Sequence, residues 1–463
     1  MPLSRRTFLK GAAAAGALAL GRQWTAFGDT LAPSAVFSTS RLSRIFPNNG
    51  LGLVHCDMHN HTLLSDGDGD PAEAFASMRS AGLDVAALTD HSTIQYLSPV
   101  DPCFWGCAGE ESLSGINETK WARMQELADM ANQNGAFVAL RGFEWSSPFQ
   151  GHMNVWFSER WIDPLTTAGA TTGEGAAAFL HEEGAPISPQ FVSQYNATMR
   201  ALPTTGTSMR GFYSWLAADP GRPILGGGRD GLASFNHPGR EPGRFGHFWH
   251  QPKIAPQVVA MEIFNRREDY MFKGVDGGSH SPLNECLNAG WRVGLSGVTD
   301  EHGENWGHET GKGRMGLWVS GPSRDNIRDS MQVRRFFATR LSGLRVDAAA
   351  GSRQMGQVLP HRSGPVTFRL DIDRGPEWWG KPLSVQVLRP GSVQPTIAHV
   401  EPVVVPADTE PIISFTVPID IEDGTWIVLR ITDPSEPADS RGGAIWAPYG
   451  NAVAYTSPWF LQA

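Results

Sequence analysis

The sequence predicts an α/β fold built on a parallel sheet, followed by a smaller β-rich region. Between residues 51 and 302, apolar segments of strand length alternate with helical patterns, which is typical of a parallel sheet. After about residue 343 the helical patterns stop and alternating apolar and polar residues begin. A chain of 463 residues has ample length for two or three domains.

The first strand–helix pair has the clearest signals. Residues 51–58 form an apolar run, and a helix is predicted to follow it. Asp70 is its expected N-cap, Pro71 its first helical residue and Glu73 the partner that completes a capping box. Gly82 is expected to end this helix. The further predicted elements are strands at 84–89, 137–140, 232–235, 258–264 and 291–295, and a second helix at 117–134.

Residues 153–230 interrupt this alternation. The segment is rich in Gly, Thr and Ala and carries several large aromatic residues. We interpret it as an insertion that either forms a wall of the substrate pocket or decorates the periphery, and the sequence favours neither, because long loops are often but not always functional.

Residues 343–463 are predicted to form a small β-sandwich-like domain. Apolar and polar residues alternate at 366–373, 383–387, 413–417 and 427–431, and turn residues separate these segments. This pattern indicates antiparallel strands with one buried face. No cluster of His and Asp occurs there, so we expect a structural role.

Residues 1–30 are predicted to be a signal peptide. The segment around Arg5 and Arg6 matches the twin-arginine export motif. The apolar run at 11–20 is shorter than the ~20 residues that span a bilayer, and small residues at 26–28 suit cleavage. We therefore expect recognition by the twin-arginine export machinery, a periplasmic location and no stable membrane insertion. The alternative is an ordinary N-terminal helix.

Charge and cysteine content exclude several classes of protein. The net charge is −9 and no run of Lys or Arg is present, so nucleic acid is not an expected partner. None of the four cysteines forms a Cys-x-x-Cys pair that would indicate a thiolate zinc site. Cys103 and Cys107 are close enough in sequence to form a disulfide in an exported protein. We expect all four to be structural.

Nine potential metal ligands fall into five short clusters, and each cluster closes a predicted strand. Imidazole and carboxylate groups bind zinc, manganese or iron. In barrels of parallel strands, functional groups collect at the carboxyl ends of the strands, so we predict one convergent metal site. The candidate ligands are His59, His61, Asp66, His91, Glu144, His152, His237, Asp300 and His302.

Other charged residues adjoin these clusters. Asp57 and Asp90 could orient an imidazole ring through its second nitrogen, or could simply close a strand-end turn. Arg240, Arg266 and Arg267 follow strand ends and could hold an anionic oxygen of a substrate, although at least one is expected in a surface ion pair.

As a set, these motifs resemble the polymerase and histidinol phosphatase (PHP) superfamily. The resemblance spans residues 51–340 and includes His59-Asn60-His61, Thr89-Asp90-His91 and Asn236-His237-Pro238-Gly239. It implies a distorted (β/α)7 barrel over residues 31–342 with two or three bound divalent metal ions. The β-rich tail and residues 336–339 are similar to a carbaryl-hydrolase-like branch.

The resemblance also implies how the ligands are shared. His59, His61, Glu144 and Asp300 would surround one ion, and Glu144, His152 and His237 a second. Asp66, His91 and His302 would hold a third. Asp66 stands where some members carry a histidine.

The ligand chemistry favours an exported phosphoesterase that uses a metal-bridging hydroxide on a small anionic or aryl ester substrate. A carbamate or carboxylester hydrolase on the same scaffold is the alternative. A non-catalytic binding protein and a protein whose metals only stabilise its fold are less favoured, because the ligand set is complete and carries no cysteine. No Ser-His-Asp arrangement is visible.

Overall fold

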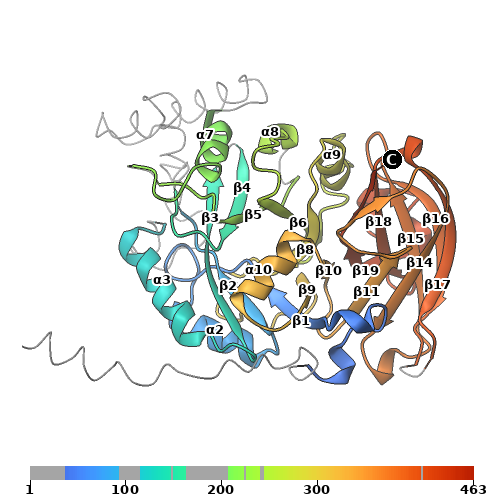
Figure 1. Cartoon of the computed structure of the whole chain (residues 1–463), viewed down its shortest axis with the longest axis horizontal. Helices are drawn as coiled ribbons and strands as arrows, with labels where there is room; N and C mark the ends of the chain where they lie inside the picture. Colours follow the sequence, from blue (N-terminus) through green and yellow to red (C-terminus); the bar gives the residue numbers. More distant parts are fainter. Residues whose placement is uncertain are drawn as a thin grey trace, which may run out of the picture.

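The computed structural model describes residues 37–92, 115–147, 150–162, 207–223, 226–239, 244–407 and 410–462. The predictions for the signal peptide, for Cys103 and Cys107, for Arg240 and for residues 163–206 of the predicted insertion lie outside these ranges. The described residues form a mixed α/β structure with one large sheet and few helices (Figure 1).

Six strands of the large sheet are arranged in two parallel groups. In the first group, β1 pairs with β2 and β2 with β3, all parallel. In the second, β5 pairs with β6 and β6 with β8, again parallel. Their bounds are β1 (Gly52–Asp57), β2 (Val85–Leu88), β3 (Val138–Ser147), β5 (Leu232–Asn236), β6 (Val258–Asn265) and β8 (Gly294–Val298).

Antiparallel strands connect and flank these groups, which the sequence did not predict. β4 (Gly151–Trp156) is antiparallel to both β3 and β5 and joins the two groups. β9 (Arg314–Val319) pairs antiparallel with β1 and with β10 (Phe336–Thr339), and β7 (Glu268–Asp269) folds back on β6. β8 lies against β10, but its described pairing is with β6 alone. A closed (β/α)7 barrel therefore stays a prediction.

The helices begin largely where their capping residues predict. Asp70 accepts a hydrogen bond from the Ala72 amide at the start of α2 (Pro71–Ser80), whose buried face includes Phe75 and Met78. Asn117 likewise caps α3 (Glu118–Ala131) by accepting from the Lys120 amide. The remaining helices are α7 (Thr207–Leu216), α8 (Arg244–Phe248), α9 (Pro282–Asn288) and α10 (Arg324–Gln332).

The predicted insertion begins inside β4, so its first residues belong to the sheet. Met153 pairs with Phe235 and Trp156 with Leu232. The sequence pattern did not predict β4, because its second partner, β5, lies about 80 residues further along the chain.

The C-terminal region forms a second sheet and extends the first. The second sheet has the order β12-β11-β14-β17, with β12 (Arg353–Gln354), β11 (Arg345–Ala350), β14 (Ser363–Asp373) and β17 (Ile413–Asp420). The large sheet continues from β10 into β19 (Asn451–Thr456). Its further strands are β13 (Val358–Pro360), β15 (Pro382–Arg389), β16 (Thr396–Val404), β18 (Trp426–Asp433) and β20 (Trp459–Gln462).

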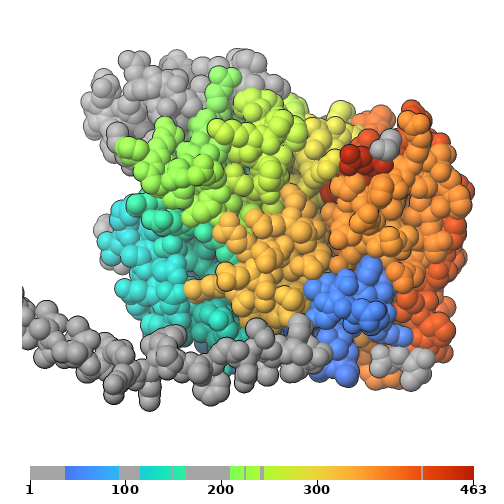
Figure 2. Space-filling model, in the orientation of Figure 1, coloured from blue at the N-terminus to red at the C-terminus, as the bar shows by residue number. Residues whose placement is uncertain are grey.

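One hydrophobic cluster lies between these C-terminal sheets. Phe368 and Leu370 of β14 are fully buried with Ile431 of β18 and Trp459 of β20. Because the large sheet runs across residue 343, the predicted domain boundary there stays a prediction. Figure 2 shows the first described residues (blue) against the C-terminal region (orange), where Ser43 and Arg44 contact Asp347 and Asp371.

Candidate metal centre

The site is built where the strands of both parallel groups end. His59 and His61 follow β1, His91 follows β2, His237 follows β5, and Asp300 and His302 follow β8. Backbone hydrogen bonds tie these ends together: the His61 amide donates to the Glu301 carbonyl and the Asp300 amide to the His59 carbonyl. These backbone hydrogen bonds explain how His59 and Asp300, about 240 positions apart in sequence, come to lie in one site.

Glu144 lies inside β3 rather than after it. The sequence predicted that this strand would end near residue 140, but it continues to Ser147 because residues 142–147 pair with β4. The β3–β4 hairpin therefore supplies two candidate ligands, Glu144 from one arm and His152 from the other.

The first group of candidate ligands lies around the C-terminal end of β1. His59 Nε2 and His61 Nε2 are only 3.0 Å apart. Glu144 Oε1 lies 3.3 Å from His59 Nε2, and Asp300 Oδ1 lies 3.4 Å from His61 Nε2. Two imidazole nitrogens that face each other beside two carboxylates form a set of lone-pair donors that suits a divalent cation.

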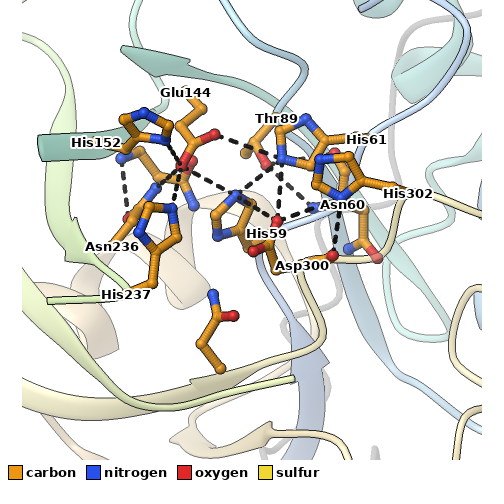
Figure 3. Close-up of polar contacts among 12 residues, drawn as sticks. His59, Asn60, His61, Thr89, Glu144, His152, Asn236, His237, Asp300 and His302 are labelled. Carbon is orange, nitrogen blue, oxygen red and sulfur yellow. Dashed lines mark hydrogen bonds and ion pairs between the residues drawn. The ribbon is translucent and has the colours of Figure 1, made fainter. Parts of the chain in front are cut away.

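The second group shares Glu144 with the first. Its Oε1 lies 3.2 Å from His152 Nδ1 and 3.2 Å from His237 Nε2. Asn236 also donates its side-chain amide to this oxygen, at 2.8 Å. Figure 3 shows His152 and His237 on one side of Glu144 and His61 with His302 on the other. Glu144 is thus placed between two groups of histidines.

The third group is centred on Asp66. Its Oδ2 lies 3.4 Å from His91 Nε2 and 3.5 Å from His302 Nε2, and its Oδ1 lies 3.7 Å from His61 Nδ1. Ligand atoms of these four residues all lie within 4.8 Å of one another. The structure therefore brings all nine sequence-predicted ligands into one contiguous cluster.

The electrostatics keep the carboxylates charged and one central imidazole neutral. Burial alone would raise the pKa of Glu144 and of Asp300, but the neighbouring histidines, and Arg266 beside Asp300, hold both well below their usual values. Burial, together with the charges of His302 and His91, lowers the pKa of His61 to about 3. Deprotonated carboxylates and neutral imidazoles are the forms that bind metal.

Glu262 is a site residue that the sequence analysis missed. Its Oε1 lies 2.7 Å from His59 Nδ1, so it orients the ring whose other nitrogen faces the ligand cluster. Its Oε2 accepts hydrogen bonds from the His237 amide at 2.6 Å and from the Asn265 side chain at 2.8 Å. The signal that the sequence offered was a single acidic residue, Glu262, within the otherwise apolar run at 258–264. In the structure, all eight residues of β6 are buried.

Of the two roles left open for Asp57 and Asp90, the strand-end role fits the structure better, because among the described residues neither carboxylate forms a hydrogen bond with an imidazole ring. Asp57 accepts from the Thr299 amide and hydroxyl and so ties the end of β1 to the end of β8. Asp90 accepts from the Thr62 amide and from Ser65 Oγ. Ser65 lies 3.5 Å from His61 Nδ1, so Asp90 acts on that ring only through the serine.

The arginines predicted to bind an anionic substrate oxygen lie in different environments. Arg266 reaches the site: its Nε lies 3.4 Å from Asp300 Oδ2 and its Nη2 lies 3.1 Å from His302 Nδ1. Arg267 points elsewhere, is exposed and pairs with Glu309. Arg240 lies outside the described residues.

Backbone strain accompanies the site. His237, Arg266 and Asp300 have positive φ angles of 28°, 51° and 49°. Left-handed backbone is unfavourable for residues other than glycine and tends to occur at functional sites. In this protein the three residues with left-handed backbone follow the ends of β5, β6 and β8, beside the ligand cluster.

The cluster is partly accessible to solvent. The side chains of His59, His61 and Glu144 are at most 1% exposed, whereas those of His302 and Arg266 are 28% and 44% exposed. His152 and Asp66 are also partly exposed.

Two segments of the chain match known sequence families, and only the first of these families has a described function. Residues 2–21 match the twin-arginine translocation pathway signal sequence, which indicates export across the membrane. Residues 74–166 match a protein family of unknown function, DUF3604. A search of curated protein sequences gave no significant match. Among the described residues, the helices are too short or too polar to cross a membrane.

Three solved structures show low similarity to the chain. A two-domain protein from Bacteroides vulgatus, described as containing a predicted PHP-like metal-dependent phosphoesterase, is 13% identical, with a TM-score of 0.38 over 88% of this chain and 95% of its own. A protein from Bifidobacterium adolescentis described as a metal-dependent phosphoesterase is 15% identical, with a TM-score of 0.28 over 60% and 95%.

The third structure is an amidohydrolase from Chromobacterium violaceum with bound sulfate and no metal. It is 14% identical, with a TM-score of 0.24 over 55% of this chain and 90% of its own. At these levels of similarity, a functional conclusion must come from the site of this chain itself.

Proposed function

We propose that the protein is an exported, PHP-like metal-dependent hydrolase with two or three divalent ions, and that its substrates are phosphoesters. The observation that carries this proposal is the position of Glu144, a buried carboxylate in contact with histidines from several strands. A carboxylate shared between groups of imidazoles is the arrangement expected of a bridging ligand.

The ligand groups fit the ions that the resemblance implies. His59, His61, Glu144 and Asp300 would hold one ion, and Glu144, His152 and His237 a second. Asp66, His91 and His302 would hold a third. Zinc, manganese and iron all suit this mixture of imidazole and carboxylate ligands.

Divalent ions in such a site supply a hydroxide nucleophile at neutral pH and neutralise charge on phosphoryl oxygens. The chain's own residues position the reactants. Glu262 fixes the ring of His59, and Asn236 fixes Glu144 through a hydrogen bond to its Oε1. Arg266, at the exposed side, offers a guanidinium to an anionic oxygen of the substrate.

Two features favour a phosphoester over an aryl carbamate. Arg266 places a positive charge at the accessible side of the cluster. The high tryptophan content of the sequence, which could have indicated an aryl pocket, is largely core: nine tryptophans are among the largest fully buried side chains. A carbamate or carboxylester hydrolase remains the alternative that the experiment must distinguish.

The test combines metal analysis of the purified exported protein with hydrolysis of p-nitrophenyl phosphate, bis-p-nitrophenyl phosphate and an aryl methylcarbamate. We expect two or three metal ions per chain and phosphoester turnover that His61→Ala abolishes. His399→Ala is the matched control, because His399 pairs with Glu401 in the C-terminal region. Turnover of the carbamate alone would refute the phosphoester assignment, and absence of bound metal would refute the hydrolase itself.

A further inference from the structure

A cavity of about 330 Å³ lies beside β1, before the end of the strand that leads to the candidate ligands. Its wall includes Leu53 and His55 of β1, whereas the ligands His59 and His61 follow the C-terminal end of that strand. The wall is completed by residues 40–41, the turn between α2 and β2, Arg314 of β9, and residues 342, 343, 345 and 373–375 of the C-terminal region.

Four arginines line this cavity, and two of them are neutralised by carboxylates. Arg41 pairs with Asp84 at 2.7 Å, and Arg345 pairs with Asp371 at 3.2 Å. Asp373, which also lines the cavity, lies 3.7 Å from Arg345 and adds to that pair. These contacts leave Arg314 and Arg374 as the remaining cations of the wall.

Neither remaining arginine forms an ion pair with a carboxylate among the described residues. Arg374 donates from Nε to the Ser342 carbonyl at 2.9 Å, and its guanidinium lies 5.5 Å from the centre of the Trp378 ring. Arg314 donates from Nη2 to the Gly307 carbonyl. Both guanidinium groups therefore keep donors that these contacts do not use.

Arg314 makes this arrangement unusual because it is buried. Its side chain is 5% exposed, and its Nη1 has no hydrogen-bond partner in the described part of the chain. The charge of Asp57 acts on Arg314, but that carboxylate already accepts hydrogen bonds from Thr299. His55 Nδ1, in the same wall, is also buried without a described partner. Buried donors that lack an acceptor are costly and need an explanation.

We propose that this cavity binds a small oxyanion, a phosphate or a carboxylate, with Arg314 and Arg374 as its charged donors. The planar guanidinium fork matches the oxygen geometry of either group. A bound anion would neutralise the two arginines and join two segments that are distant in sequence: β9, which carries Arg314, and the C-terminal segment that carries Arg374. This site is independent of the metal centre and of the reaction proposed there.

The experiment measures binding of inorganic phosphate and, in parallel, of acetate by calorimetry at constant ionic strength. The full chain carries His61→Ala and is treated with chelator, so that phosphate bound at the metal centre does not contribute. We expect saturable binding of at least one anion. Arg374→Gln should weaken it about tenfold or more, because a charge-assisted hydrogen bond is lost.

Two further variants make the result specific. Arg314→Met should also weaken binding; if this variant fails to fold, the Arg374→Gln result decides, since that side chain is nearer the surface. Arg123→Gln is the control, because Arg123 is exposed on α3 and pairs with Glu126 far from the cavity. The proposal is overturned if neither anion binds saturably, or if Arg374→Gln binds as tightly as the Arg123→Gln control.

Discussion

Replacing Glu262 by Gln is the sharpest test of how the metal centre is organised. The carboxylate accepts three hydrogen bonds: from His59 Nδ1 at 2.7 Å, from the His237 amide at 2.6 Å and from the Asn265 side chain at 2.8 Å. A carboxylate accepts at both oxygens, whereas a glutamine accepts at one oxygen and donates from its nitrogen. Glutamine has almost the same shape, so the change isolates hydrogen bonding.

Neither orientation of the new amide satisfies the site. If its oxygen accepts from His59, its NH2 group faces the two other donors. If its oxygen faces the His237 amide and Asn265, its NH2 group donates to His59 Nδ1. That donation moves the ring proton to Nε2, the atom that faces Glu144 and His61. A protonated Nε2 cannot bind a metal ion.

We therefore expect Glu262→Gln to weaken metal affinity about 10- to 100-fold, or about 1.4–2.7 kcal/mol, the range found for partners that orient metal ligands. The assay is competition with a chromophoric chelator at fixed pH. Glu285→Gln is the matched control, because it removes a similar contact, Glu285 to His247 at 2.8 Å, away from the ligands. Equal metal affinity in the two variants would show that Glu262 does not set the tautomer of His59.

Four further perturbations test other parts of the structure. Arg266→Ala should raise KM for phosphate monoesters about 10- to 100-fold, through loss of a charged hydrogen bond, and leave aryl carbamate hydrolysis unchanged; equal effects on both would remove Arg266 from phosphate recognition. Chelator should lower the Tm of the parent but not that of Glu144→Ala, since only the parent gains stability from bound metal. Tyr455→Phe should lower the free energy of unfolding by about 1–3 kcal/mol in urea, because the buried Tyr455 hydroxyl donates to Asp269 and accepts from Arg430. Burial raises the pKa of Asp347 from 3.8 to about 7, so its contribution to stability is full below pH 3.8 and is lost as the pH rises toward 7. Asp347→Asn should therefore lose less stability than the parent between pH 4 and 8, with a difference of at most about 4 kcal/mol, and an unchanged pH profile would contradict this assignment.

The sequence predicts those parts of the fold that depend on local signals. Apolar runs located β1, β2, β5 and β6, the cap Asp70 located the start of α2, and the helical spacing of apolar residues located α3. The direction of β4 depends on its pairing with β5, and the length of β3 depends on its pairing with β4. Neither pairing leaves a periodic trace within a single strand, which is why both features were missed.

The candidate ligands were predictable for a related reason. Residues that follow parallel strands are carried to the same edge of a sheet whatever the exact register, so their convergence requires only that the strands be parallel. Histidine is rare enough in this chain, at 14 residues, that clusters of it at strand ends stand out. The roles of Asp57 and Asp90 required more, because the direction of a side chain at a strand end depends on which backbone amides it can reach.

Glu262 shows where such prediction stops. Glu262 pairs with Ser296 of β8 and Phe264 pairs with Gly297, so Ile263 is an extra residue on β6 at this point. Such a bulge locally changes strand twist and re-aims the side chains beside it. An eight-residue apolar strand that carries one acid predicts an acid buried in the core, but not which face it lies on. In the structure, the bulge accompanies a Glu262 side chain that contacts His59 and the backbone of His237 together. The residue that orients the candidate metal ligands is therefore fixed by strand register, which becomes visible only when the sheet is assembled.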